Sequence, residues 1–195
     1  MKLEYLCASL NRDKGLKRLE QSADAPFHVQ IETVPRAIWR FWGDLVRSSD
    51  ADIMAIVNDY LEIAPGCADA IRRTFDEQFP DTDGVMGLYR SKQSGFDGPH
   101  LVIGKKFIER FPNRVFFCPE YWHFWSDREF WAYAKSMDKA VVNPDAMVIV
   151  HEFEPGDTTY KDSRKYKKQD LERWNARQKA GLLWGRTFEL LGEEV

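Results

Sequence analysis

The sequence predicts an α+β protein with a helix-rich amino-terminal half, an antiparallel or mixed sheet of four to six strands covered by helices, and a basic carboxyl-terminal helix. Helical periodicity gathers in residues 38–79, and short β-like runs gather between residues 85 and 154. A polar, basic segment follows them. Helices and strands that are segregated along the chain in this way are typical of α+β folds and not of a regular βαβ alternation.

The first half of the chain predicts two strands and three amphipathic helices. A strand is expected over Lys2–Leu10, and strict alternation of apolar and polar residues predicts another over Phe27–Glu32. Apolar residues then recur at i, i+3, i+4, i+7 and i+8 from Ile38 to Val46 and again from Ile53 to Leu61. A weaker pattern of the same kind covers Ala68–Phe79. These three consecutive helices are the basis for the helix-rich half.

The second half predicts short strands, one helix and a longer strand. Turn residues such as Asp81–Gly84 separate the β-like runs. Ser126 and Glu129 have the spacing of a capping box, which opens a helix over Asp127–Met137. An Asn-Pro-Asp turn then leads into the strand Ala146–Glu154. The three short β-like runs are Val85–Tyr89, Leu101–Ile103 and Val115–Cys118.

Charge is distributed unevenly along the chain. The whole chain has a net charge of −3, whereas residues 161–186 carry nine Lys or Arg against three acids, a net of +6. The last nine residues carry −3, which leaves −6 for residues 1–160. We therefore expect a single acidic α+β body over residues 1–160. Residues 161–195 would be a basic helix, about Lys161–Lys179, and a tail that packs on the body or extends from it.

Composition excludes several classes of protein. With 195 residues, of which 44% are hydrophobic, the chain has the length and composition of an ordinary globular protein. The longest aliphatic stretch, Ala146–Val150, is too short to span a bilayer, so no membrane partner is expected. Glu4 interrupts the apolar run that a secretory leader needs. Three cysteines, an odd number, fit free thiols in a reducing compartment. These observations predict a cytoplasmic protein.

Nine of the eighteen residues from Phe116 to Tyr133 are aromatic, although aromatic residues make up 14% of the chain. Phe130 and Trp131 have helical spacing after the capping box and are expected to pack a helix onto the sheet. Residues 119–125 fit neither the strand nor the helix period, so they predict an irregular loop, and loops mostly run over the surface. This loop is either part of the core or a partner-binding surface, with Tyr121, Trp122 and Trp125 as anchors and Arg128 at the rim.

No motif in the sequence is specific to one reaction. H-E-x-x-H, C-x-x-C, G-x-S-x-G and the two common glycine-rich phosphate-binding motifs are absent, and the sequence therefore predicts neither a metal site nor a cofactor. His151 lies near the end of the predicted strand Ala146–Glu154, on the face opposite Glu152 and Glu154, which favours a histidine packed in the core. The alternative is acid–base chemistry by His123 and His151, with Glu120 or Glu154 as the carboxylate partner.

The two candidate surfaces lead to the predicted function. We expect a non-enzymatic binding protein, such as a regulator, inhibitor or immunity-type protein, that recognises a macromolecular partner, most simply a protein, through the aromatic loop and the basic helix. One alternative is a nucleic-acid-associated protein that uses the basic helix. The other is a hydrolase or transferase of unrecognised type with His123 and His151 as acid–base groups. The basic surface would consist of Lys161, Arg164, Lys165, Lys167, Lys168, Arg173 and Arg177.

Overall fold

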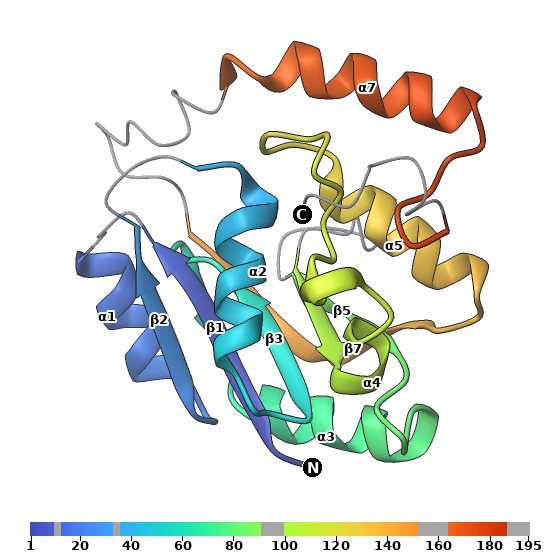
Figure 1. Ribbon diagram of the computed structural model, residues 1–195. Coiled ribbons are helices and arrows are strands. Elements are labelled where there is room, and N and C mark those ends of the chain that lie inside the picture. Colours follow the sequence, from blue (N-terminus) through green and yellow to red (C-terminus); the bar gives the residue numbers. More distant parts are fainter. Residues whose placement is uncertain (10–12, 33–35, 91–99, 152–163, 187–195) are drawn as a thin grey trace.

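A seven-stranded mixed sheet in the order β2-β1-β3-β6-β5-β7-β4 forms the centre of the computed structural model (Figure 1). The structure describes residues 1–9, 13–32, 36–90, 100–151 and 164–186. Five strands run in the same direction, and β6 and β4 run against them. The strands are β1 (Leu3–Ser9), β2 (Phe27–Ile31), β3 (Ile53–Val57), β4 (Leu61–Ile63), β5 (Val85–Arg90), β6 (Leu101–Gly104) and β7 (Ala140–Val150).

Strands and helices alternate in the amino-terminal third. The helix α1 (Asp13–Ser22) joins β1 to β2, and α2 (Ile38–Ser48) joins β2 to β3. Because β1 pairs in parallel with both β2 and β3, the chain must cross over the sheet between these strands, and a helix is the usual crossover. The carboxyl ends of the three strands therefore meet at one edge of the sheet.

The predicted α+β fold class is wrong in its central feature. The helix expected over Ile53–Leu61 is the strand β3 followed by the start of β4, and the sheet has seven strands instead of four to six. All five residues of β3 are buried. The sequence of a strand that is buried on both faces is a continuous run of apolar residues. Such a run also has apolar residues at the i, i+3, i+4 and i+7 positions that predict a helix. The amino-terminal half is consequently not helix-rich.

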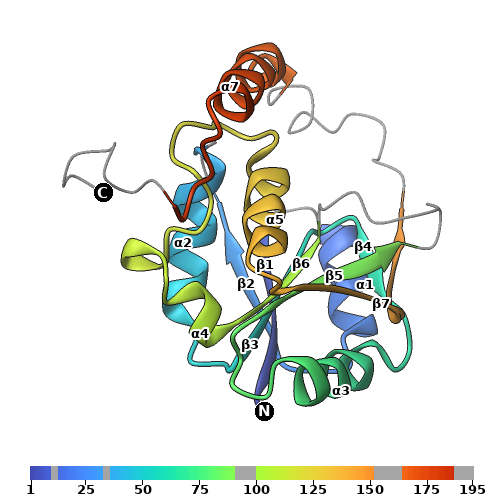
Figure 2. The same ribbon diagram turned by 90° about the vertical axis from the view of Figure 1, so that its right-hand side faces the viewer.

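Helices cover both faces of the sheet (Figure 2). On one face lie α2, α4 (Lys105–Ile108) and α5 (Ser126–Ser136), with the 3-10 helix Pro112–Arg114 beside α2. On the other face lie α1 and α3 (Cys67–Gln78). Each face has its own hydrophobic core, one built around Trp42 and Phe107 and the other around Tyr5 and Phe75. In both views α7 (Lys167–Lys179) lies beyond one edge of the sheet, above α2 and α5.

The strand β7 is longer than predicted. It begins at Ala140, and the Asn-Pro-Asp segment that predicted a turn is an irregularity within the strand. Its pairing with β5 jumps from Asn143 to Met147 at this point. The predicted strand Val115–Cys118 is not a strand, although all four of its residues are buried.

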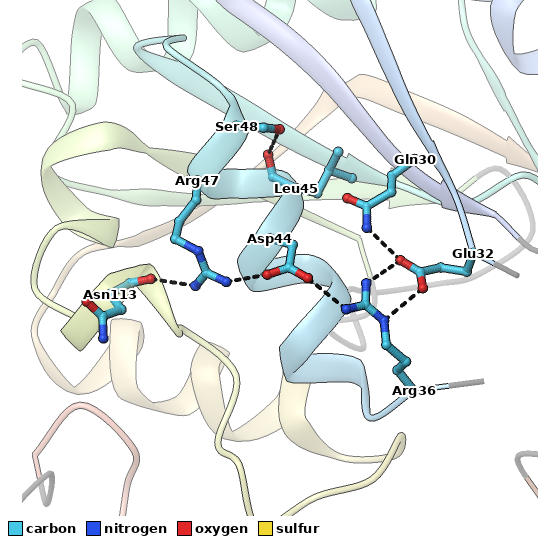
Figure 3. A network of polar contacts seen from close by, with 8 residues as sticks. All are labelled: Gln30, Glu32, Arg36, Asp44, Leu45, Arg47, Ser48 and Asn113. Carbon is cyan, nitrogen blue, oxygen red and sulfur yellow. Dashed lines mark hydrogen bonds and ion pairs between the residues drawn. The ribbon is translucent and has the colours of Figure 1, made fainter. Parts of the chain in front are cut away.

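Ion pairs connect the end of β2 to α2 and to the 3-10 helix (Figure 3). Arg36 donates from Nε and Nη2 to Glu32, which follows β2, and from Nη1 to Asp44 of α2 at 2.8 Å. Asp44 also pairs with Arg47, whose Nη1 donates to the carbonyl oxygen of Asn113 at 2.9 Å. This network connects Glu32, directly after β2, to α2 and to the 3-10 helix. No helix among the described residues is long and apolar enough to cross a membrane.

Candidate functional site

Polar residues gather where β1 and β3 end. Ser9 is the last residue of β1, and Asn58-Asp59-Tyr60 follows β3 directly. The hydroxyl of Ser9 donates to Asp59 Oδ2 at 2.6 Å, and the two residues are only 3% and 5% exposed. In open α/β sheets, ligands bind outside the carboxyl ends of the strands. The Ser9–Asp59 pair therefore marks the first part of a candidate site.

The first turn of α1 packs tightly against this pair. A Cβ atom added at Gly15 would lie 2.0 Å from the carbonyl oxygen of Asp59, which is far inside van der Waals contact. Glycine is needed here because only a residue without a side chain allows the helix backbone to approach so closely. The helix α1 thus holds the backbone at Asp59 in place.

Tyr60 and His100 extend the site along the sheet edge. Asn58 Nδ2 donates to the Tyr60 hydroxyl at 3.0 Å, and the rings of Tyr60 and His100 meet edge to face with their centroids 5.8 Å apart. His100 is fully buried, and neither ring nitrogen has a hydrogen-bond partner among the described residues. Burial, helped by the charge of Arg90, lowers the pKa of His100 to about 3. His100 is therefore neutral at physiological pH.

Asp127 is the second carboxylate of the site. It lies in the first turn of α5 and is half-buried. Loss of surrounding water raises the pKa of Asp127 to about 6, although backbone amides and the charges of Arg128 and Arg90 oppose the rise. Burial, first of all, raises the pKa of Tyr60 to about 12, and the charges of Asp127 and Asp59 add to this rise. The Tyr60 hydroxyl is therefore protonated at physiological pH.

His151 adjoins this site at the end of β7. Its backbone N–H donates to the carbonyl oxygen of Tyr60 at 3.0 Å, and its Nε2 lies 2.8 Å from Glu62 Oε2. His151 is half-buried, and its carboxylate partner is Glu62, which the sequence did not suggest. The predicted partner Glu154 lies outside the described residues.

The donor atoms of this edge do not form a ready metal centre. Within the described ranges, no group of three or more His, Cys, Asp or Glu side chains is arranged to hold a metal ion. Ser9 already bonds one oxygen of Asp59, and Glu62 pairs with His151. These residues therefore do not fit a metal ion by themselves.

The aromatic loop packs against the end of the chain. Tyr121 is 1% exposed and donates to Glu129 Oε2 at 2.6 Å. Trp122 is half-buried, and its ring stacks on Tyr166 with the centroids 4.4 Å apart. Trp125 is half-buried against the core, and Arg128 is exposed. Of the predicted anchors, Tyr121 lies inside the protein.

The remaining predicted acid–base residues have separate neighbours. His123 lies edge-on to Phe124, with the ring centroids 4.9 Å apart, and burial lowers the pKa of His123. Glu120 forms an ion pair with Arg177 of α7. His151, by contrast, pairs with Glu62.

The predicted basic surface divides between the outside and the inside of the protein. Arg173 is half-buried and donates to the carbonyl oxygen of Glu120. Arg177 is 6% exposed and pairs with both Glu120 and Glu129. Lys161 lies outside the described residues. The exposed members are Arg164, Lys165, Lys167 and Lys168.

The residues that form the site were missed by sequence reasoning. Asn58 and Asp59 follow an apolar run directly, which is a signal for a strand end, but the helical interpretation of that run concealed it. Asp127 was interpreted only as part of a helix start. Ser9 and His100 become notable only once the sheet brings β1, β3 and β6 together.

No protein-family model matches the chain, and no curated protein matches it significantly in sequence. Solved structures share its fold. The mannosyltransferase PcManGT from Pyrobaculum calidifontis, solved with GDP-Man and Mn²⁺, has a TM-score of 0.57 and 14% identity over 87% of this chain. TarS 1–349 from S. aureus has a TM-score of 0.60 and 14% identity over 77% of this chain.

Two further structures also match. TarS 1–349 solved with UDP-GlcNAc matches with a TM-score of 0.57 and 11% identity over 80% of this chain. A197 from STIV matches with a TM-score of 0.50 and 13% identity, over 79% of this chain and 96% of its own. The chain spans 61% of the length of the mannosyltransferase and 60% of TarS 1–349. At these identities, the similarity shows the fold.

The comparisons correct the predicted function. The interpretation as a non-enzymatic binding protein, with a regulator, inhibitor or immunity-type role, is wrong, because the chain shares its fold with a mannosyltransferase and with TarS. The expected recognition of a macromolecular partner, protein or nucleic acid, is wrong for the same reason, since two of these structures hold nucleotide sugars. Among the predicted alternatives, the comparisons favour the transferase.

Proposed function

We propose that this protein transfers a sugar from a nucleotide-sugar donor to a hydroxyl group of an acceptor. The observation that carries the proposal is the buried Ser9–Asp59 pair at the carboxyl ends of adjacent parallel strands. It lies on a fold shared with proteins that hold GDP-Man and UDP-GlcNAc. Polar groups at this edge of an α/β sheet are suited to orient a nucleotide ligand.

Asp127 is our candidate for the general base. Its raised pKa, about 6, makes it a better proton acceptor than an ordinary aspartate while leaving it ionised at neutral pH. In the transfer step, the acceptor oxygen bonds to the anomeric carbon of the donor sugar as the bond from that carbon to the diphosphate oxygen breaks. The acceptor proton passes to Asp127, and the nucleoside diphosphate leaves with the bonding electrons.

The donor side of the site is the part to test first. The purified protein is incubated with a panel of UDP- and GDP-sugars, with and without sugar acceptors, and release of nucleoside diphosphate is measured. Asp59→Asn should lower kcat/KM by about 100-fold or more, because it removes a preorganised charge from the site. Asp76→Asn, on the exposed face of α3, is the matched control and should leave the rate unchanged.

The same assay separates transfer from hydrolysis. Product that forms only when an acceptor is present indicates a transferase, whereas donor cleavage by water alone indicates a hydrolase. If the wild-type protein neither binds nor cleaves any donor of the panel, the proposal is wrong.

A further inference from the structure

The helix α7 presents two charged residues to the interior. Asp170 and Arg177 are seven residues apart, which is two helical turns, so they lie on one face of the helix. They are 0% and 6% exposed, whereas most other residues of α7 are exposed. Buried charges are costly unless they are paired, so each must have specific partners.

Asp170 binds the backbone of the aromatic loop. Its Oδ1 accepts from the N–H of Trp122 at 3.0 Å, and its Oδ2 accepts from the N–H groups of His123 and Phe124 at 2.8 and 2.9 Å. Three consecutive amides thus converge on one carboxylate, and hydrogen bonds to a charged acceptor are among the stronger ones in proteins. Trp125 follows with φ of 64°, and α5 begins at the next residue.

Arg177 binds Glu129 in the first turn of the same helix, α5. It donates from Nε and Nη2 to Glu129 at 3.0 and 2.7 Å. Glu129 also accepts from the Tyr121 hydroxyl and from the backbone N–H of Trp184, both at 2.6 Å. Glu129 lies in the first turn of α5, two residues after Asp127. Asp127, the candidate base, therefore lies between two segments that α7 binds: residues 122–124 and Glu129.

The start of α5 has little support of its own. No side chain caps it within the described part of the chain, and the buried hydroxyl of Ser126 has no partner there. The predicted capping box does not form, because Glu129 bonds with Arg177 instead. The position of this first turn consequently depends on contacts from α7.

We propose that Asp170 is a positioning residue: by binding the amides of residues 122–124, it fixes the first turn of α5 and with it the carboxylate of Asp127. This inference rests on the proposed function for the role of Asp127, but the coupling between the two aspartates is a property of the fold. Asp170 acts from 43 residues further along the chain and does not itself contact the substrate.

The test compares two amide substitutions on the same helix. Asp170→Asn keeps the side-chain volume but loses the charge and one acceptor oxygen, while Glu172→Gln removes the same charge from the exposed face. The carboxyl carbon of Asp127 is titrated by NMR in each full-length variant, and kcat and KM for the donor are measured beside it. Asp170→Asn should lower the Asp127 pKa by about one unit or more, because a loosened helix start admits water.

The kinetic expectation is equally specific. In Asp170→Asn, kcat should fall about tenfold while KM for the donor stays the same, because the base is misplaced and the donor site is intact. Glu172→Gln should behave like the wild type in both measurements. Asp170→Glu, which retains the charge but displaces the carboxylate, should resemble Asp170→Asn and replaces it if the Asn variant does not fold.

The outcomes distinguish this inference from the proposed function. If the Asp170 variants lower only the thermal midpoint and change neither the Asp127 titration nor kcat, Asp170 is structural and the inference is overturned. If the wild type has no activity on nucleotide sugars but the titration of Asp127 shifts in the variants, the proposed function fails and the positional coupling stands.

Discussion

The pKa values of Asp127 and His100 are both shifted in the direction that favours the uncharged form, and both for the same physical reason. Burial raises the pKa of the carboxyl group to about 6 and lowers that of the imidazole to about 3. Only Asp127 therefore changes its charge near the pH at which enzymes work. Of these two groups, Asp127 is therefore the one whose titration activity would follow.

We expect the pH dependence of kcat to report this titration. The base must be ionised, so kcat should rise as the pH increases through about 6 and level off above it. Asp127→Asn should lower kcat by about 100-fold or more and remove this rise. A pH–rate profile from pH 4.5 to 8.5 measures both effects.

A thermal melt provides the control for this variant. Because the pKa of Asp127 is higher in the folded protein than in the unfolded chain, its ionisation opposes folding, and this cost is fully present above about pH 6. Asp127→Asn should therefore be no less stable than the wild type at pH 8. An unchanged pH profile in the variant would exclude Asp127 as the base.

At the scale of elements, the contact between α1 and the end of β3 sets the position of Asp59. The close approach at Gly15 leaves no room for a side chain, and the neighbouring atom is backbone, which cannot rotate away. Gly43 of α2 offers a contrast. A Cβ atom there would meet the end of the Arg47 side chain at 3.3 Å, and that flexible group can move.

Alanine substitutions at these two glycines should have opposite effects. Gly15→Ala should destabilise the fold by about 1–3 kcal/mol, because α1 must shift away from Asp59. Gly43→Ala should stabilise it by up to about 1 kcal/mol, because alanine favours a helix more than glycine does. Urea denaturation measures both changes, and equal stability of the two variants would contradict the packing described here.

At the scale of the whole molecule, Trp184, close to the end of the described residues, belongs to the core. Trp184 is 2% exposed, its Nε1 donates to the carbonyl oxygen of Val115 at 2.8 Å, and its backbone N–H donates to Glu129. It lies in the same hydrophobic core as Trp42 and Phe107. The carboxyl-terminal segment therefore completes the face of the sheet that carries α2, α4 and α5.

Replacing Trp184 should consequently weaken the entire protein. Trp184→Ala is expected to lower the free energy of unfolding by about 3–5 kcal/mol in one cooperative transition. Trp184→Phe retains most of the buried surface but loses the bond to Val115, so it should cost only about 1–2 kcal/mol. The unfolding transition followed by circular dichroism should coincide with the transition followed by near-ultraviolet signals. A separate early transition confined to the helix content would show that α7 unfolds by itself.

Sequence patterns predicted several helices and strands close to their observed positions. The helices α2, α3 and α5 and the alternating strand β2 agree with the expected ranges to within a few residues. The strand β3 was mistaken for a helix because burial on both faces removes the alternation that identifies a strand. The helix α1 was not predicted at all.

The candidate site was largely inaccessible to such reasoning. Asp59 was hidden because the assignment of β3 was wrong. The raised pKa of Asp127 depends on burial in the folded chain, which the charge of Arg90, a residue of the distant strand β5, opposes. The contact of Asp170 with residues 122–124 joins segments 46–48 residues apart. No local pattern encodes contacts of this kind.

The carbonyl oxygen of Trp122 accepts from the N–H of Ile38, the first residue of α2, at 2.8 Å, so the aromatic loop also supports the helix that follows β2. One short loop thus serves as a common anchor for α2, α5 and α7. Its length is consequently constrained: one inserted residue would change the register of the three amides on Asp170 and move the carbonyl away from α2. Engineers who wish to add a tag, a linker or a new chain end to this protein should leave residues 119–125 intact.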